Sequence, residues 1–195
     1  AGAAGQSSYI VGMPSALAGE AKAFADAPVQ VLQDYMILRT LRSYAGYLSK
    51  PINDANFAFY GTVLSGAPQQ PVRWKRAVST VSGALGEEIG QQYVAAYFPP
   101  ASKASADQLV KNIIAAMGRR IDKLTWMAPE TKVKAHARLA AFTPKIGYPS
   151  KWRDYTALQV KRDDLVGNVA AANQFEYQRD LHKLGQPIDR TEWGM

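Results

Sequence analysis

Histidine, aspartate and glutamate are the residues of this 195-residue chain that could hold a metal or move a proton, because the chain has no cysteine. Its two histidines, His136 and His182, lie far apart in the sequence. A zinc-binding helix needs further ligands three or four residues away. Positions 132, 133, 139 and 140 are instead Lys, Val, Leu and Ala, and His182 is flanked by Gln178, Arg179 and Gln186. Both histidines are therefore predicted to be surface or packing residues, and no metal ligand is assigned.

Two pairs of adjacent acids, Glu87-Glu88 and Asp163-Asp164, could in principle act as a general acid and base. Neighbouring helix residues point about 100° apart, however, so the two carboxylates of a pair do not face each other. Asp163-Asp164 and Glu130 also stand where helices should begin, and the helix dipole favours acids there. We predict structural roles for these acids, and no catalytic residue is assigned.

Glycines at positions 83, 86 and 90 are the remaining cluster that suggests a ligand. Glycine-rich segments cradle phosphates where a strand turns into a helix, whereas these glycines lie within an apolar helical stripe. Each glycine costs a helix about 1 kcal/mol relative to alanine. Close approach of another helix is the expected compensation, and no cofactor-binding residue is assigned.

Two long helices are predicted to dominate the chain. Between residues 71 and 97, apolar residues recur every three or four positions at Trp74, Val78, Val81, Leu85 and Ile89. A second stripe of the same period runs through residues 102–127 at Val110, Ile114, Met117, Ile121 and Leu124. Such stripes indicate helices that pack along one face, and their length suits a bundle-like lobe.

Shorter elements complete the prediction. Helices are expected over residues 14–24, 28–48, 129–144 and 163–184, and another from Asn53 or Asp54 to between residues 61 and 66. A short strand is expected at residues 9–11, and the loop over 144–162 could hold another near 158–160. The predicted fold class is all-α, with at most a few short strands. No repeat or linker divides the chain, so residues 1–195 are expected to form a single helical lobe.

The segment from Leu124 to Tyr155 has the most distinctive residue order in the chain. Trp126-Met127 precedes Pro129, which is tolerated in the first turn of a helix. Pro144 ends that helix, and Ile146-Gly147-Tyr148-Pro149 follows as a turn in which Gly147 can take a positive φ. Trp152 stands shortly after this turn.

This order resembles the neprilysin and endothelin-converting-enzyme family of zinc metallopeptidases. Other segments are similar to the same family in the same order, and the similarity covers the chain from about Tyr9 onward. These segments are Tyr44-Ala45-Gly46-Tyr47-Leu48-Ser49, Arg73-Trp74-Lys75-Arg76, Gly86-Glu87 with Gly90 and Tyr93, Tyr97-Phe98-Pro99 with Lys103, and Asp189-Arg190-Thr191-Glu192-Trp193.

The resemblance implies an enzyme that binds zinc through H-E-x-x-H and a later glutamate. In the family this motif lies downstream of the Glu-Trp element, here Glu192-Trp193, and neither histidine of this chain belongs to such a motif. The chain is therefore expected to be an internal part of a larger metallopeptidase, a helical cap lobe that restricts access of oligopeptide substrates. Zinc and the catalytic lobe would belong to the whole enzyme, and this chain alone is predicted to be inactive. The resemblance also implies a periplasmic or secreted location.

Charge keeps a second class of function open. The chain carries 23 basic and 16 acidic residues, a net charge of +7, so a stand-alone basic helical module for an anionic partner is the alternative. Its basic residues are dispersed and accompany no nucleic-acid-binding motif, so no nucleic acid is expected. No apolar run approaches the roughly 18 residues of a membrane span. A reading frame that continues past Met195 into H-E-x-x-H would favour the metallopeptidase, and a stop codon would favour the module.

Overall fold

The computed structural model describes residues 5–193. The chain divides into two compact units. The first comprises residues up to 78 together with 157–186, and the second comprises 79–156 together with the segment from 187 onward. The expectation of a single lobe stays a prediction.

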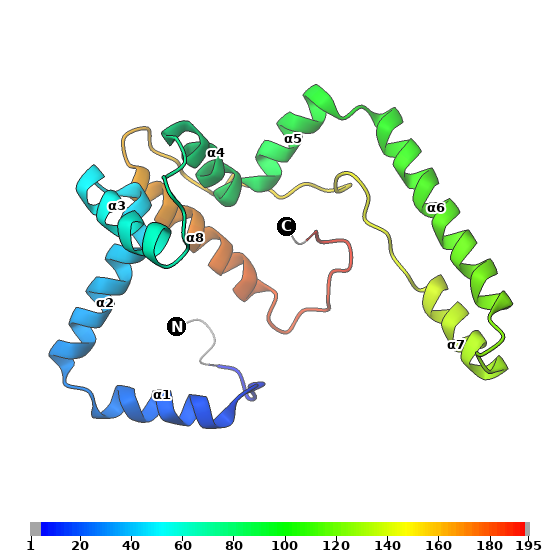
Figure 1. Ribbon diagram of the computed structural model, residues 1–195, viewed down its shortest axis with the longest axis horizontal. Helices are drawn as coiled ribbons and strands as arrows, with labels where there is room; N and C mark the ends of the chain where they lie inside the picture. The colour runs from blue at the N-terminus through cyan, green and yellow to red at the C-terminus, as the bar shows by residue number, and fades with distance from the viewer. Residues whose placement is uncertain (1–4, 194–195) are drawn as a thin grey trace. The chain divides into compact units, whose positions relative to one another are not determined.

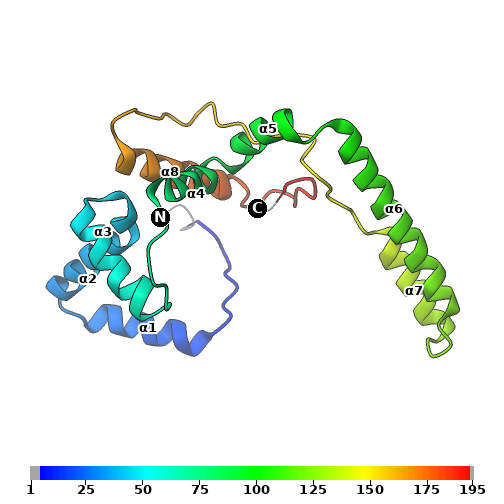
Figure 2. The same cartoon turned by 45° about the horizontal axis from the view of Figure 1, so that its top comes forward.

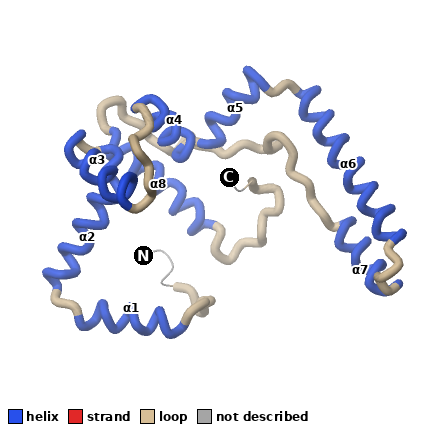
Figure 3. Tube along the Cα trace, viewed as in Figure 1, coloured by secondary structure: helices blue, strands red, loops and turns tan. Residues whose placement is uncertain are grey.

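The predicted all-α class is confirmed (Figures 1 and 3). Residues 9–11 and 158–160 form no strand, so both strand predictions are wrong. An isolated extended segment has no neighbouring ladder to pair its backbone groups, and residues 5–193 contain no strand that could supply one. The α-helices of the described residues are α1 Pro14–Asp26, α2 Val29–Tyr44, α3 Lys50–Asn56, α4 Arg73–Ala84, α5 Gly86–Tyr97, α6 Pro100–Lys123, α7 Pro129–Ala140 and α8 Leu165–His182.

In the first unit, α2 leads through a 3-10 turn at Ala45–Tyr47 into α3, which a π-helical turn at Phe57–Val63 extends. The helix α3 begins at Lys50, before the predicted cap at Asn53 or Asp54. Pro51 sits in its first turn, where the missing N–H costs nothing. Asn53 is consequently inside the helix and buried, and its side-chain oxygen accepts a hydrogen bond from Gln70 Nε2 at 2.5 Å.

The helix α8 begins directly after Asp163-Asp164, where the acid pair predicts a helix start. The Asp164 carboxylate accepts a hydrogen bond from the Gly167 N–H at 2.8 Å and caps the first turn. Asn168 pairs with both backbone groups of Lys161, receiving its N–H at 2.8 Å and donating to its carbonyl at 2.6 Å. The loop before α8 is thereby fixed to the helix that follows it.

The single helix predicted over residues 71–97 is wrong: the chain breaks at Leu85, between α4 and α5. Leu85 takes φ −131° and ψ 40°, outside the helical range. Gly83 and Gly86 flank this residue, and each weakens a continuous helix by about 1 kcal/mol. Glu87 and Glu88 then lie in the first turn of α5, next to the positive end of its dipole.

In the second unit, α6 and α7 lie side by side (Figures 1 and 2). A Cβ built on Gly118 of α6 would make ordinary van der Waals contacts across this pair, with Leu139 at 3.7 Å and His136 at 3.8 Å. His136 Nε2 pairs with Asp122 Oδ1 at 2.7 Å, and Lys132 Nζ donates to the Asp122 carbonyl at 2.7 Å. Polar contacts thus fasten the two helices near the turn that joins them.

Candidate functional site

His136 lies in α7, and His182 is the last residue of α8. His136 joins α7 to Asp122 of α6, and its side chain is 40% exposed. The Nδ1 atom of His182 lies 2.6 Å from the Gln178 carbonyl of its own helix. Among residues 5–193, no three His, Cys, Asp or Glu side chains gather where they could share a metal ion. Since zinc takes three or four protein ligands, the donor set around either histidine does not fit zinc.

The acids separate into different environments, as the helical spacing predicts. Glu87 is buried, with 5% of its surface exposed, whereas Glu88 is exposed. Glu130 lies in the first turn of α7, where the dipole favours it. The structural roles predicted for these acids stay a prediction.

Glu87 is instead the centre of a contact between α5 and the loop that follows α7. One carboxylate oxygen accepts the backbone N–H of Arg153 at 2.6 Å, and the other lies 3.3 Å from Arg153 Nη2. The two side chains are 6% and 20% exposed, respectively. The helix end adds its dipole to the same carboxylate. A charge held by a guanidinium, a backbone N–H and a helix terminus fixes the position of Arg153.

One turn further along α5, Gly90 receives the ring of Trp152. A Cβ on Gly90 would lie 3.2 Å from Trp152 Cζ3. The glycine therefore permits the close approach that its sequence predicts, although the partner is a loop tryptophan and not a helix. We call Glu87, Gly90, Trp152 and Arg153 the loop clamp.

A second set of contacts continues the clamp toward α6. Tyr148 stacks on Trp152, with ring centroids 5.9 Å apart and planes at 10°, and meets Phe98 edge-on at 6.0 Å. Lys103 Nζ donates to the carbonyls of Ile146 and Tyr148. Lys103 Nζ also lies 4.9 Å from the centroid of the Tyr148 ring. Aromatic and charged contacts of this kind immobilise the turn.

Gly147 has the positive φ that the sequence predicts, at +74°. A Cβ there would come within 2.9 Å of Phe98 Cε1, so space as well as backbone conformation favours glycine. The turn therefore packs against Phe98, the residue that follows the last residue of α5.

The loop clamp positions backbone and supplies no nucleophile or proton-transfer pair. Sequence reasoning missed the pairing of Glu87 with Arg153, which are 66 residues apart. The sequence offered one signal for this pairing. Glu87 is an acid in the first turn of a helix, has no basic partner nearby in the sequence, and is followed three residues later by Gly90.

Comparison with known proteins places these features in a family. The sequence model of peptidase family M13 matches residues 1–149. The neutral endopeptidase of Lactobacillus helveticus is 32% identical over 166 residues, covering 84% of this chain and 26% of that protein. Human neprilysin is 29% identical over 170 residues, covering 83% of this chain and 22% of that protein.

Solved structures agree with the sequence matches. The crystal structure of Mycobacterium tuberculosis zinc metalloprotease Zmp1 in complex with an inhibitor is 40% identical, with a TM-score of 0.84. That match covers 93% of this chain and 27% of Zmp1. The open state of Zmp1, solved by cryo-electron microscopy, gives 41% identity and a TM-score of 0.83.

This chain spans about a quarter of the length of the relatives it matches. The family match nevertheless extends over three quarters of this chain's residues, and it includes Glu87 and Gly90 of the loop clamp, whereas Trp152 and Arg153 lie beyond it. It takes in the glycine turn at Gly147 and both partners of the α6–α7 pairing. The chain therefore belongs to peptidase family M13, among the neprilysin-like metallopeptidases.

Proposed function

We propose that this chain is the helical cap region of a zinc metalloendopeptidase that hydrolyses oligopeptides, and that its zinc ligands lie elsewhere in the polypeptide. Membership of family M13 is the observation that carries the proposal, together with relatives named neutral endopeptidase and zinc metalloprotease. When bound, zinc would polarise the scissile carbonyl and lower the pKa of a water molecule. No step of that chemistry is assigned to a residue of this chain.

The part assigned to this chain is steric. The α6–α7 pair and the loop clamp hold helices and loop in fixed relation within the second unit, through contacts of 2.6 to 3.3 Å at Glu87 and Arg153. A rigid wall of this kind suits a cap that admits unfolded peptides and excludes folded proteins. Its partners would be oligopeptide substrates and the catalytic lobe, with no nucleic acid among them. None of the helices among residues 5–193 has the length and apolar character of a membrane span. By its family, the whole enzyme acts outside the cytoplasm.

Zinc content tests the location of the metal site. In the full-length protein, a His136→Ala/His182→Ala double variant is expected to retain stoichiometric zinc by metal analysis. It should also retain the chelator-sensitive cleavage of a short peptide. Loss of zinc in this variant, with the helical content unchanged by circular dichroism, would place a metal ligand in this chain and overturn the proposal.

Substrate size tests the cap. Cleavage of one peptide sequence is measured free in solution and again within a folded protein, using full-length enzyme with Glu87→Ala and, as the matched control, Glu88→Ala. The Glu87 variant loosens the loop clamp and is expected to change the ratio of the two rates while zinc content stays constant. Identical ratios in both variants, with the loosened loop verified by faster hydrogen exchange, would contradict a cap role.

A further inference from the structure

The α6–α7 pair of the second unit carries most of the net charge of this chain. The sequence distributes its basic residues in small groups, but the fold lays α6 against α7 (Figure 2). Residues 100–140 contain eight lysines and arginines and three acids, and they therefore hold five of the chain's seven net positive charges. We call residues 100–140 the basic hairpin.

Most cations of the basic hairpin are exposed to solvent. Lys103 and Lys132 are half-buried and donate to backbone carbonyls, which do not cancel a positive charge. No lysine or arginine among residues 100–140, as the structure describes them, takes part in an ion pair. The exposed cations are Lys111, Arg119, Arg120, Lys123, Lys134 and Arg138.

The three acids of the basic hairpin reduce this charge unevenly. Asp107 and Glu130 each stand four residues before a lysine of the same helix, where side chains are neighbours. Asp122 is the one acid within four residues of Arg120 and Lys123, and it pairs with the histidine of α7. The end of α6 therefore keeps its positive charge.

The cations point outward on both edges of the helix pair. Gly118 and Asp122 face α7, since both lie close to the side chain of His136. Arg120 lies two residues after Gly118, about 200° around α6, and therefore points away from α7. Lys134 lies two residues before His136 and, by the same geometry, points away from α6. The positive field therefore surrounds the hairpin and is not confined to one face.

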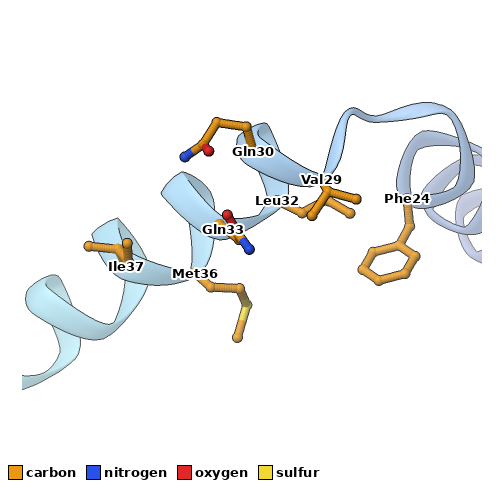
Figure 4. Close-up of a pocket in the computed structure, with 7 residues that line it drawn as sticks. All are labelled: Phe24, Val29, Gln30, Leu32, Gln33, Met36 and Ile37. Carbon is orange, nitrogen blue, oxygen red and sulfur yellow. The ribbon is translucent and has the colours of Figure 1, made fainter.

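The groove between α1 and α2 in the first unit has no comparable charge. Its volume is about 590 Å³. Phe24 of α1 and Met36 of α2 are among the side chains that line it (Figure 4). Its polar side chains are Gln30 and Gln33, and none of the lining residues is basic. The groove therefore does not select for an anionic partner, whereas the basic hairpin does.

We propose that the basic hairpin attracts acidic oligopeptides, so that peptides rich in Asp and Glu are cleaved in preference to neutral ones. The inference rests on the proposed function, because it takes the substrate to be an oligopeptide. Charges act over about 10 Å at 0.1 M salt, and a field of one sign raises the rate at which oppositely charged substrates associate. An unfolded peptide can respond to cations on both edges of the hairpin, because it needs no fixed docking plane.

A lipid surface and a second copy of the chain fit these observations less well. A flat bilayer meets one side of a helix pair, so it would leave either Arg120 or Lys134 away from the lipid. A second copy would bring the same five net positive charges to the contact, and like charges oppose association. A flexible anionic chain has neither limitation.

Two peptides and two charge variants of the full-length enzyme test this preference. The peptides share one cleavable core and differ in the flanking residues, which are Glu in one and Gln in the other. The hairpin variant is Arg120→Gln/Lys123→Gln. The matched control is Lys161→Gln/Arg162→Gln, which removes two exposed cations of the first unit and changes the net charge equally.

At about 0.1 M salt the parent enzyme is expected to cleave the Glu peptide with a higher kcat/KM than the Gln peptide. The hairpin variant should lose roughly threefold to tenfold in kcat/KM for the Glu peptide. Its kcat should stay unchanged, because the charge acts on association and not on the bound state. The control variant should change by less than about twofold. At about 1 M salt the preference should disappear, because screening is then nearly complete.

Equal cleavage of the two peptides by the parent enzyme, or equal losses in the hairpin and control variants, would overturn the proposal. Equal cleavage together with retention on anionic phospholipid vesicles that only the hairpin variant loses would assign the hairpin to a lipid surface instead. Fluorescence anisotropy of the labelled Glu peptide measures binding without cleavage. An enzyme that cleaves neither peptide contradicts the proposed function, and the anisotropy of the parent and the hairpin variant still decides whether the hairpin attracts acidic peptides.

Discussion

The guanidinium of Arg153 lies 3.3 Å from one carboxylate oxygen of Glu87, while the backbone N–H of the same arginine donates to the other oxygen at 2.6 Å. One residue of the loop thus satisfies both oxygens of a buried acid. Removing the acid leaves the arginine only 20% exposed and without this partner. The pair therefore matters more through the cost of breaking it than through its net attraction.

Glu87→Ala is expected to lower the free energy of unfolding by about 2–4 kcal/mol, because it removes both contacts of a buried charge. Glu87→Gln keeps an acceptor for the Arg153 N–H and should cost less, about 1–2 kcal/mol. Chemical denaturation measures both values. Glu88→Gln, an exposed neighbour in the same helical turn, should stay within about 0.5 kcal/mol of the parent chain. Equal effects at positions 87 and 88 would show that the clamp contributes nothing.

Gly90→Ala is expected to destabilise the protein, although alanine favours a helix. A Cβ there would lie 3.2 Å from Trp152 Cζ3, and that ring is already held by its stacking on Tyr148. Overpacking of this kind costs about 1–3 kcal/mol, more than the gain in helix propensity. Thermal unfolding would measure the difference.

Gly83→Ala is the matched control for Gly90, because nothing lies within 4 Å of a Cβ built there. It should stabilise the chain by about 0.5–1 kcal/mol through propensity alone. Combining Gly90→Ala with Trp152→Phe makes room for the methyl group, so the two changes should couple favourably. Strict additivity of the two would argue against contact between these residues.

Gly147→Ala should be more costly than Gly185→Ala, although both glycines have φ of +74°. The left-handed conformation costs either alanine about 1–2 kcal/mol. At position 147 the new Cβ would also approach Phe98 Cε1 to 2.9 Å, whereas position 185 is open. We expect the difference between the two variants to be about 1 kcal/mol or more. Chemical denaturation of the two variants, compared at the same dependence of the unfolding free energy on denaturant, measures this difference. A larger loss of stability for Gly185→Ala than for Gly147→Ala would mean that Phe98 does not pack on the turn.

Asp154 gives the structure a defined response to acid. Its carboxylate accepts the backbone N–H of Thr156 at 2.8 Å, and this bond, followed by one from the Thr156 side chain, lowers its pKa below the ordinary 3.8. A lowered pKa in the folded state adds stability above the unfolded-state value, which is lost as pH falls through the folded-state value. NMR titration of the carboxyl carbon should give a midpoint below 3.8. A midpoint at or above that value would contradict the hydrogen bonds to Thr156.

Local chemistry explains what the sequence predicts correctly. The start of α8 after Asp163-Asp164, the positive φ of Gly147 and the proline in the first turn of α7 each depend on a few adjacent residues. Such features are determined by backbone geometry and short-range hydrogen bonds. They stay the same whatever packs on the helix.

Features that depend on distant residues were not predictable in the same way. The apolar stripe through Trp74 and Val78 indicates a helix, but period alone does not show that the chain breaks at Leu85. Trp74 and Val78 are 65% and 55% exposed, so the stripe identifies an apolar face without identifying its partner. Glu87 similarly finds Arg153 only through tertiary contact, because nothing in its own helix marks an arginine 66 positions later.

The separation of Glu87 from Arg153 also sets an order of events during synthesis. The acid leaves the ribosome 66 residues before the arginine that satisfies it, an interval of roughly 3–13 s at the usual rates of translation. Throughout that interval α5 carries a carboxylate and a bare glycine surface that nothing yet covers. Nascent chains of this protein therefore complete the packing of α5 only after α6 and α7 have emerged. Slowed translation over codons 124–153 should prolong the time for which a chaperone can engage this helix.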